Sequence, residues 1–279
     1  MSGAATLSPF VLIRSAGEMA SAIACRLYRA NIGRLCLVDL AEPLCVRRSV
    51  SFCPALEQGS AVVEGVEARR ARSAAEIQEQ WRQGRIAVMC TDDWRADGGL
   101  APDVVVDAIL AKRNLGTRRD EAPLVIGLGP GFTAGEDCHL VVETNRGHDL
   151  GRIIDSGHAA PNTGVPGAIA GFAAERVLRA PIGGIFASGR RIGDTVSKGE
   201  AIGYVGDQPV TAGLDGVLRG LIRSGTAVGA GLKLGDIDPR GDARYCLSIS
   251  DKARAIAGSV LEAVVGRFNR PDQSVLPKR

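Results

Sequence analysis

The sequence predicts an α/β fold, in which a doubly wound, mostly parallel sheet is followed by a small β barrel-sandwich. Three observations lead to this expectation. Short β-branched runs alternate with helical stretches from Phe10 to about Val142, as in parallel sheets whose strands are joined by helices. Short strands punctuated by glycine follow from about residue 180 and contain an internal repeat. A last helical stretch begins after Ser250.

The alternating segments are expected to form a Rossmann-like, nucleotide-binding-type domain over residues 1–179. Runs such as VVVDAIL are apolar throughout, which is typical of a strand covered by helices on both faces. The expected strands are FVLIR, LCLVD, IAVMCT, VVVDAIL, LVIGLG and HLVVET, and the expected helices are EMASAIACRLYRA and AAEIQEQWRQ. The stretch AIAGFAAERVLRA, ending at Ala180, is expected to be a helix that closes the domain.

Residues 180–245 contain two halves that align when Ala180 is set over Ala212. The alignment pairs glycine with glycine and aliphatic with aliphatic residues, for example Gly184 with Gly216, Gly193 with Gly225, and Val196 with Val228. Two such glycine-turned units packed together resemble the biotinyl and lipoyl domains. In those domains the modified lysine lies on the hairpin between the halves, here GDQPVT, which has no lysine. We therefore expect a barrel-sandwich without the modified lysine, and we expect Lys198 to be a solvated turn residue.

Residues 246–279 are expected to form a C-terminal helix, capped by Ser250, and a tail. The apolar start LSPFVLI is interrupted by Arg14 and is expected to be a first strand instead of a signal peptide. No uncharged run approaches the length of a membrane-spanning helix, so no membrane partner is expected.

Composition excludes several classes of function. The 34 basic and 31 acidic residues leave a net charge of +3, and aromatic residues make up 4%, so neither a nucleic-acid groove nor a stacking surface is expected. The seven scattered cysteines include no C-x-x-C pair, which argues against a disulfide framework and favours a reduced, cytoplasmic protein. The three histidines lack a metal-binding spacing, so no metal site is expected.

The first candidate site is the loop Ser15-Ala16-Gly17-Glu18. Ser15, Gly17 and Ala20 have the spacing of a G-x-G-x-x-G/A nucleotide loop between a strand and a helix. Asp39 ends the next strand, where an acidic residue can accept from a ribose hydroxyl. Against this, Ser15 replaces the first glycine, and Glu18 adds negative charge where phosphates would lie. The alternative is a nucleotide-type fold whose first loop no longer binds a dinucleotide.

A second candidate site is the glycine-rich turn in LVIGLGPGFTAG, which contains Gly127, Gly129, Pro130 and Gly131. Its backbone could lie close to a flat or anionic ligand, since it follows a strand at the edge where open α/β sheets bind ligands. The alternative is a tight crossover turn.

Polar residues are expected at the same edge of the sheet. Cations and amide donors beside two carboxylates would suit a phosphorylated, polar ligand, although each residue singly could be an ordinary strand-end cap. The loop HAAPNTGVPG, with Asn162 and Thr163, is expected to be a lid over this edge. No catalytic residue is indicated, because there is no G-x-S-x-G motif, and Cys90 and Cys138 are single thiols. The edge residues are Asp107, Lys112, Arg113, Glu143, Asn145, Arg146 and His148.

Long motifs in this order resemble the YqeB-like family, the selenium-dependent molybdenum hydroxylase system proteins. The motifs are RSAGEMASAIACRLYRANI, VDAILAKRNLGT, APLVIGLGPGFTAGED, VVETNRGHDLGRII, NTGVPG, ERVLRAP and, in the last segment, GVLRGLI followed by GLKLGDIDPRGD. The family has G-A-G-D where this chain has Ser15-Ala16-Gly17-Glu18, which is a departure at the first nucleotide contact.

The resemblance implies an accessory protein for the maturation of selenium-dependent molybdenum hydroxylases. Its ligand would be a phosphorylated cofactor of the molybdopterin type, and its partners a client hydroxylase and other cofactor-maturation proteins. An NAD(P)-dependent oxidoreductase that uses Gly17 and Asp39, with the barrel as substrate domain, is the alternative. The sequence therefore does not decide between a molybdopterin-type cofactor and NAD(P), nor whether the protein forms a homo-oligomer.

Overall fold

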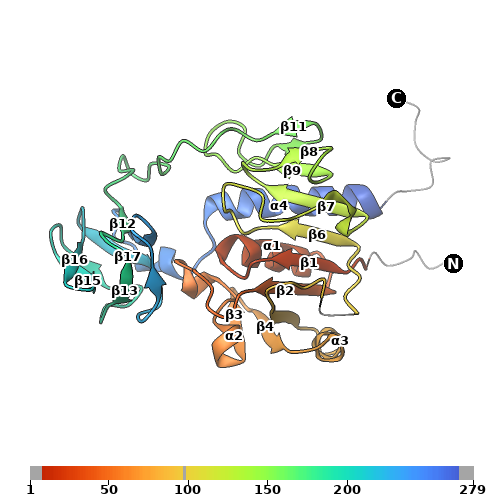
Figure 1. Cartoon of the computed structure of the whole chain (residues 1–279), viewed down its shortest axis with the longest axis horizontal. Helices are drawn as coiled ribbons and strands as arrows, with labels where there is room; N and C mark the ends of the chain where they lie inside the picture. Colours follow the sequence, from red (N-terminus) through yellow and green to blue (C-terminus); the bar gives the residue numbers. More distant parts are fainter. Residues whose placement is uncertain (1–7, 97–98, 270–279) are drawn as a thin grey trace.

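The computed structural model describes residues 8–96 and 99–269, and it contains a large α/β part and a smaller part made of antiparallel strands (Figure 1). The large sheet has nine strands. The edge strands β10 and β3 pair antiparallel, and all pairs between them are parallel. The strand order is β10 (Ile153–Ile154), β9 (Leu140–Val142), β7 (Leu124–Leu128), β6 (Val104–Asp107), β1 (Val11–Arg14), β2 (Leu35–Asp39), β5 (Ile86–Cys90), β4 (Val66–Ala71) and β3 (Ser60–Val63).

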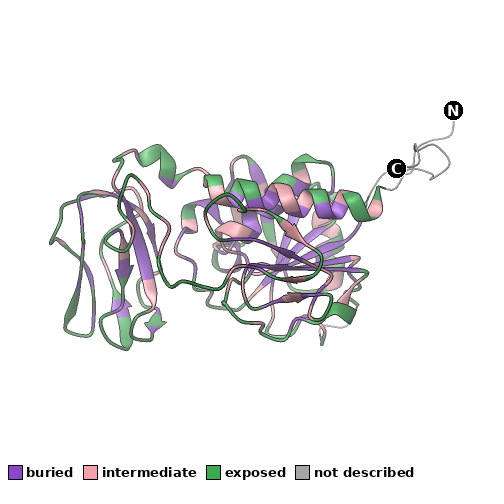
Figure 2. Cartoon of the chain, turned by 90° about the horizontal axis from the view of Figure 1, so that it is seen from above, coloured by how far each residue is buried: buried purple, intermediate pink, exposed green. Residues whose placement is uncertain are grey.

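Both faces of this sheet are buried, as the apolar runs predict. Successive residues of a strand point to opposite faces, so Val11 and Ile13 of β1 lie in the core cluster formed with α1 (Glu18–Arg29) and α4 (Asp251–Phe268). Leu12 lies in a second cluster with Ile77 of α3 (Ala74–Arg82). Figure 2 shows most of the residues of these strands as buried. The α/β prediction is therefore confirmed, and the sheet is a mixed one.

The strand expected over VVVDAIL is shorter than predicted, because β6 ends at Asp107. The buried Asp107 carboxylate accepts hydrogen bonds from the Thr117 hydroxyl at 2.6 Å and from Arg14 Nη1 at 3.0 Å. These bonds turn the chain away from the sheet, and Leu110 and Lys112 take positive φ angles of 59° and 65° in the following loop. A short α2 (Ala55–Gln58) and a small pair of strands, β8 (Thr133–Ala134) and β11 (Gly157–His158), complete the large part.

The smaller part consists of two four-stranded antiparallel sheets that share one core, with Phe186 from one sheet and Leu218 and Ile237 from the other. The repeat seen in the sequence appears in the backbone, since the paired Gly184 and Gly216 both have φ 159°. One sheet has the order β12 (Val177–Arg179), β19 (Lys233–Asp238), β17 (Gly216–Leu221) and β14 (Thr195–Val196); the other has β16 (Gln208–Thr211), β15 (Ala201–Val205), β13 (Gly184–Ala187) and β18 (Ala227–Val228).

The helix expected over AIAGFAAERVLRA does not form, so this prediction was wrong. The segment makes a turn closed by reciprocal bonds between Ile169 and Phe172, and then continues as strand β12. β12 pairs with β19, and the Ala180 amide donates to the Leu232 carbonyl at 2.9 Å. The helix propensity of the alanines is thus overridden by pairing with a distant strand. The first strand of the smaller part therefore begins at Val177, before residue 180.

The helix expected after Ser250 is α4, and the Ser250 side chain accepts from the Ala253 amide as predicted for an N-cap. The helix packs against α1, so the chain returns to the large part at its end. The first seven residues and the end of the predicted tail, from residue 270, lie outside the described residues. Within the ranges that the structure covers, no helix combines the length and apolar character needed to cross a membrane.

Candidate functional site

A strongly basic cavity lies between the large sheet and the smaller part of the chain. It has a volume of about 580 Å³, and we call it the cationic cavity. Among the described residues that line it, Glu18 is the only acidic one, so the wall is dominated by positive charge. The basic side chains in its wall are Lys112, Arg146, Arg176, Arg179, Arg219, Lys233 and Lys252.

One side of the cationic cavity is formed by the segment that crosses from β11 to β12 (Figure 1). Asn162 and Thr163 lie in this segment and line the cavity, as the predicted lid position implies. Its two ends are held by polar contacts. The buried Glu143 carboxylate accepts from the Ala160 amide at 2.6 Å, and Arg176 Nη2 donates to the Gly167 carbonyl at 2.9 Å.

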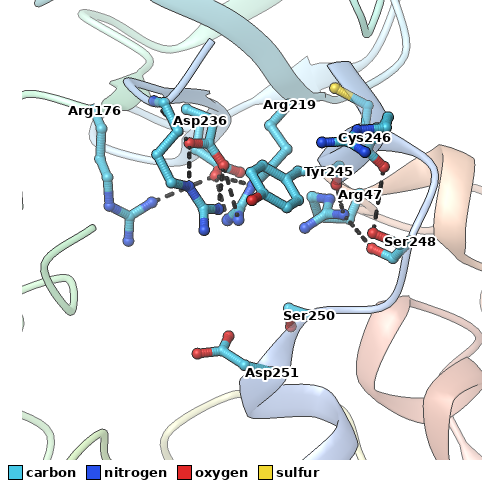
Figure 3. A network of polar contacts seen from close by, with 12 residues as sticks. Arg47, Arg176, Arg219, Asp236, Tyr245, Cys246, Ser248, Ser250 and Asp251 are labelled. Atoms are coloured by element: carbon cyan, nitrogen blue, oxygen red, sulfur yellow. Dashed lines mark hydrogen bonds and ion pairs between the residues drawn. The ribbon is translucent and has the colours of Figure 1, made fainter. Parts of the chain in front are cut away.

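The opposite side of the cavity is built around Asp236, which is 1% exposed. Arg219 Nη2 lies 2.8 Å from its carboxylate and Arg176 Nη1 3.4 Å (Figure 3). Lys233 Nζ lies 3.6 Å from the same carboxylate. Burial alone would raise the pKa of Asp236, but the surrounding cations lower it below its usual value. One buried carboxylate thus faces three cations, and Asp238 adds a weaker contact to Arg219 at 3.4 Å, so positive charge exceeds negative charge on this side of the cavity.

The two lysines from the large part have lowered basicity. Burial, followed by the charges of Lys112 and Arg146, lowers the pKa of Lys252 to about 8. Burial also lowers the pKa of Lys112, against the attraction of Glu143. Positive charge crowded into a partly desolvated space is costly without a counter-ion, and a bound anion would relieve that cost.

Two further charged residues that line the cavity already have partners. Arg146 makes a two-pronged contact with Asp251 at the start of α4, at 2.8 and 2.9 Å. Glu18 accepts from the Ser250 amide at 3.1 Å and lies 3.4 Å from Arg47. These contacts join the beginnings of α1 and α4, so the acidic group that seemed unfavourable for phosphate is directed towards a helix N-terminus and a guanidinium.

The loop after β1, which the sequence suggested as a nucleotide loop, has two of its amides engaged by side chains of the protein itself. Ser15 keeps φ at 100°, a region that favours glycine. Its hydroxyl accepts from the Gly17 amide at 3.1 Å, and the Asp39 carboxylate accepts from the Ala16 amide at 2.6 Å. Burial raises the pKa of Asp39, although these hydrogen bonds oppose the rise. The Asp39 carboxylate thus stabilises the loop through the Ala16 amide, whereas the sequence suggested that it would accept a hydrogen bond from a ribose hydroxyl.

A second cavity of about 490 Å³ lies beside this loop, at the carboxyl ends of β1, β2 and β5, and we call it the apolar cavity. Ser15, Gly17 and Asp39 line it together with Trp94. The Trp94 indole Nε1 is buried without a hydrogen-bond partner in the part of the chain that the structure describes. Most of its wall is apolar, although the charged Arg14, Asp92 and Arg95 also line it. The partly exposed aliphatic side chains in the wall are Leu40, Leu44, Ile109 and Leu115.

The glycine-rich turn after β7 is tightly packed. A Cβ atom at Gly127 would lie 2.5 Å from the Phe132 ring, one at Gly129 2.3 Å from Thr144 Oγ1, and one at Gly131 2.5 Å from the Arg113 backbone. These glycines line neither cavity, and only Pro130 of this turn reaches the cationic cavity. The structure therefore assigns them to close packing, as in the crossover-turn alternative.

Replacing Gly129 by alanine is expected to destabilise the protein by about 3 kcal/mol, from the left-handed φ of 77° together with overpacking against Thr144. Gly135 is the matched control, because it has φ 92° but nothing within 4 Å of the added Cβ. Its alanine variant should cost only about 1–2 kcal/mol. Urea unfolding measures both, and equal losses would contradict the packing explanation.

The candidate residues from the sequence thus separate into three groups. Glu18, Lys112, Arg146, Asn162 and Thr163 meet in the cationic cavity, with Asn145. Ser15, Gly17 and Asp39 meet in the apolar cavity. The others line neither: Ala16, Asp107, Arg113, Gly127, Gly129, Gly131, Glu143 and His148.

Sequence reasoning missed the basic residues that come from the smaller part and from α4. Arg176 lies in the segment expected to be helical, and Arg219, Lys233 and Lys252 were not singled out as site residues. The motifs ERVLRAP and GLKLGDIDPRGD contain Arg176 and Lys233, so a charged residue inside a long motif was the available signal.

Comparison with known proteins gives one strong sequence match. No family model matches the chain. It is 50% identical over 255 residues to "Uncharacterized protein YqeB" of Escherichia coli K12, and the match covers 91% of this chain and 47% of that protein. The chain therefore spans about half the length of this curated relative.

Similarity to solved structures is weak. TcdA (CsdL) aligns with a TM-score of 0.33 and 15% identity, over 94% of this chain and 89% of TcdA. The ectoine utilization protein EutE (DoeB) from Ruegeria pomeroyi aligns with a TM-score of 0.23 and 11% identity, over 81% of this chain and 56% of EutE. Scores this low carry no argument about function.

Proposed function

We propose that this chain, which is YqeB-like over most of its length, binds a phosphorylated, anionic small molecule in the cationic cavity. The observation that carries the proposal is the convergence of basic side chains from β12, β17, β19, α4 and the loop after β6 on one concave space. Segments far apart in the sequence supply one kind of charge there, which is what a built anion site requires and what ordinary strand capping does not produce.

The chemistry of the wall favours a ligand with several negative charges. The cavity volume of about 580 Å³ is in the range of small-molecule and cofactor sites. Lysine binds phosphate as a point charge, and arginine can bind it with two parallel hydrogen bonds. Asn162 and Thr163 add neutral polar groups on the lid side. A single carboxylate would leave most of these charges without a partner.

We further propose that the ligand is a cofactor of the molybdopterin type, and that the protein is an accessory factor for selenium-dependent molybdenum hydroxylases. A flat, phosphorylated molecule matches two neighbouring cavities, one basic and one apolar, on either side of the α1 N-terminus. Gly17 lines the apolar cavity and Glu18 the cationic one. In this proposal the large part is a Rossmann-like domain, and the lysine-free smaller part is a barrel-sandwich that forms one wall of the site.

An NAD(P)-dependent oxidoreductase is the second candidate, and one observation favours it. The apolar cavity holds Asp39 and the unpartnered Trp94 indole at the strand ends where dinucleotides bind in open α/β sheets. The amides of Ala16 and Gly17 argue against this candidate, because they already donate to Asp39 and Ser15 and are not free to bind a pyrophosphate. Calorimetric titration of the wild type and of an Asp39→Ala variant with NAD and NADP separates the candidates, since only the oxidoreductase requires binding that depends on Asp39.

Anion binding is expected to weaken above about pH 8, because Lys252 loses its proton there. Below this pH the ammonium attracts the anion, and above it the attraction is lost. Sulfate is a suitable probe, since its charge is constant over this range, and its affinity should be measured by calorimetry from pH 6 to pH 10. In the Lys252→Arg variant the affinity for sulfate should fall much less with pH, because arginine stays charged over this range. An equal fall in both proteins would contradict this role of Lys252.

Native mass spectrometry of the protein purified from a host supplied with molybdate and selenium tests the proposal as a whole. The expected result is a non-covalent adduct that contains phosphorus and is absent from a variant with Lys112 and Lys252 both replaced by alanine. An adduct that persists in this variant would contradict the cationic cavity as its site. A tightly held NAD(P) mass would favour the oxidoreductase.

A further inference from the structure

We propose that Cys45 and Cys53 form a dithiol that undergoes thiol–disulfide exchange in the wall of the apolar cavity. The two thiols converge on one hydroxyl, since Cys45 Sγ lies 3.2 Å and Cys53 Sγ 3.1 Å from Ser51 Oγ. Because both contacts end on the same oxygen atom, the two sulfurs lie at most about 6 Å apart, and in this proposal side-chain rotation brings them to bonding distance. The other free cysteines among the described residues show no such mutual contact.

The environment makes Cys45 the attacking thiol. Hydrogen bonding from the Cys53 thiol and the Ser51 hydroxyl lowers the pKa of Cys45, against burial and the charges of Asp39 and Glu18. The same contact raises the pKa of Cys53. Of the two thiols, Cys45 therefore loses its proton more readily and Cys53 less readily, which is the division found in dithiol exchange sites.

Access to the pair is also asymmetric. Cys45 lines the apolar cavity of about 490 Å³, whereas Cys53 lines a different, much smaller cavity with Glu42 and Pro54. A small disulfide that enters the apolar cavity therefore meets Cys45 first. Cys45 is also close to the first loop, since a Cβ atom at Gly17 would lie 4.0 Å from its sulfur.

The segment that carries Cys53 is fixed to the same loop. The amides of Phe52 and Cys53 both donate to the Ala16 carbonyl, at 3.1 and 2.9 Å, and the Phe52 amide also donates to Ser21 Oγ at 2.8 Å. A disulfide would thus link the Cys53 segment, which is hydrogen-bonded to the loop at Ala16, to Cys45 in the wall of the apolar cavity next to Gly17.

The exchange balances with a low-molecular-weight disulfide as oxidant. The Cys45 thiolate attacks one sulfur of that disulfide, forms a mixed disulfide and releases one thiolate. Cys53 then loses its proton and attacks the Cys45 sulfur, so that the protein disulfide forms and the second small thiolate leaves. The two protein thiols supply two electrons and two protons, and the oxidant becomes two thiols.

Oxidised glutathione tests this proposal on the whole protein. The wild type should lose two hydrogen atoms in its intact mass, and a peptide map should show a bond between Cys45 and Cys53. Cys53→Ser should stop at one glutathione adduct on Cys45, while Cys45→Ser should form neither product at these positions. Cys36 is an internal control, because burial raises the pKa of its thiol to about 12 and it should stay reduced.

Two results would overturn the proposal. One is that Cys45 and Cys53 of the wild type remain fully open to alkylation under denaturing conditions after long exposure to oxidised glutathione. The other is that Cys53 of the Cys45→Ser variant reacts as fast as Cys45 of the Cys53→Ser variant. If a variant fails to show native-like circular dichroism, the peptide map of the wild type decides the question by itself.

Discussion

Replacing Lys112 and Lys252 together by alanine is expected to weaken the binding of inorganic pyrophosphate by about 100-fold or more, since each charge-assisted hydrogen bond contributes about 1.5–3 kcal/mol. Both lysines line the cationic cavity from the large part of the chain. Burial lowers the pKa of both lysines in the free protein, and a bound anion would stabilise their charged forms. Calorimetric titration at pH 7 measures the loss.

The Lys198→Ala variant is the matched control for this experiment, because it removes the positive charge of a lysine that does not line the cationic cavity. Its side chain is exposed in a turn of the smaller part, and its amide donates to Asp215 at 2.7 Å. Lys198→Ala should bind pyrophosphate as the wild type does. A loss of affinity in Lys198→Ala as large as that in the double variant would show that binding reflects overall charge and not this cavity.

Replacing Asp236 by asparagine is expected to lower the stability of the folded state by about 3–5 kcal/mol, because a buried ion pair loses one partner. The carboxylate is 1% exposed and contacts Arg176, Arg219 and Lys233. The variant should at the same time bind pyrophosphate more tightly, since the same cations then lack their internal counter-charge. Urea unfolding and calorimetry on the same preparation measure these opposite effects.

Asp120→Asn is the control for Asp236→Asn, because Asp120 pairs with Arg118 where both side chains are largely exposed. Exposed pairs contribute about 0–1 kcal/mol, so this variant should differ little from the wild type. Weaker pyrophosphate binding by Asp236→Asn, with a native-like circular dichroism spectrum, would contradict the proposal that Asp236 competes with the ligand for the cations.

The sequence was sufficient for the parts of the fold that rest on local pattern. The alternation of apolar strands and amphipathic helices predicted β1, α1, β2, α3 and β5 close to their observed bounds. The paired glycines predicted equivalent turns in the two halves of the smaller part, and these have matching φ angles. Both features depend on short stretches of chain, in which periodicity and turn chemistry decide the structure.

Features that depend on distant contacts were not predicted correctly. The alanines before Val177 favour a helix by propensity, but pairing with β19 makes the following residues a strand. The glycines after β7 suggested an open backbone surface, whereas Phe132, Thr144 and the Arg113 backbone fill the space beside them. Neither contact leaves a signal at the position where the prediction was made.

The candidate site was predicted in part for the same reason. Strand-end residues such as Lys112 and Arg146 could be placed at one edge, because parallel strands end together. Arg219, Lys233 and Lys252 come from the smaller part and α4, and the sequence does not show how these elements fold back on the sheet. The basic character of the cavity is therefore a property of the tertiary structure, while the net charge of +3 gives little indication of it.

A crystal structure of the protein grown with pyrophosphate tests the central claim most directly. We predict electron density for the anion in the cationic cavity, with its oxygens within hydrogen-bonding distance of Lys112, Lys252 and at least one arginine from the smaller part. Pyrophosphate bound instead at the loop around Gly17, or an empty cationic cavity in crystals that contain saturating pyrophosphate, would contradict the proposal.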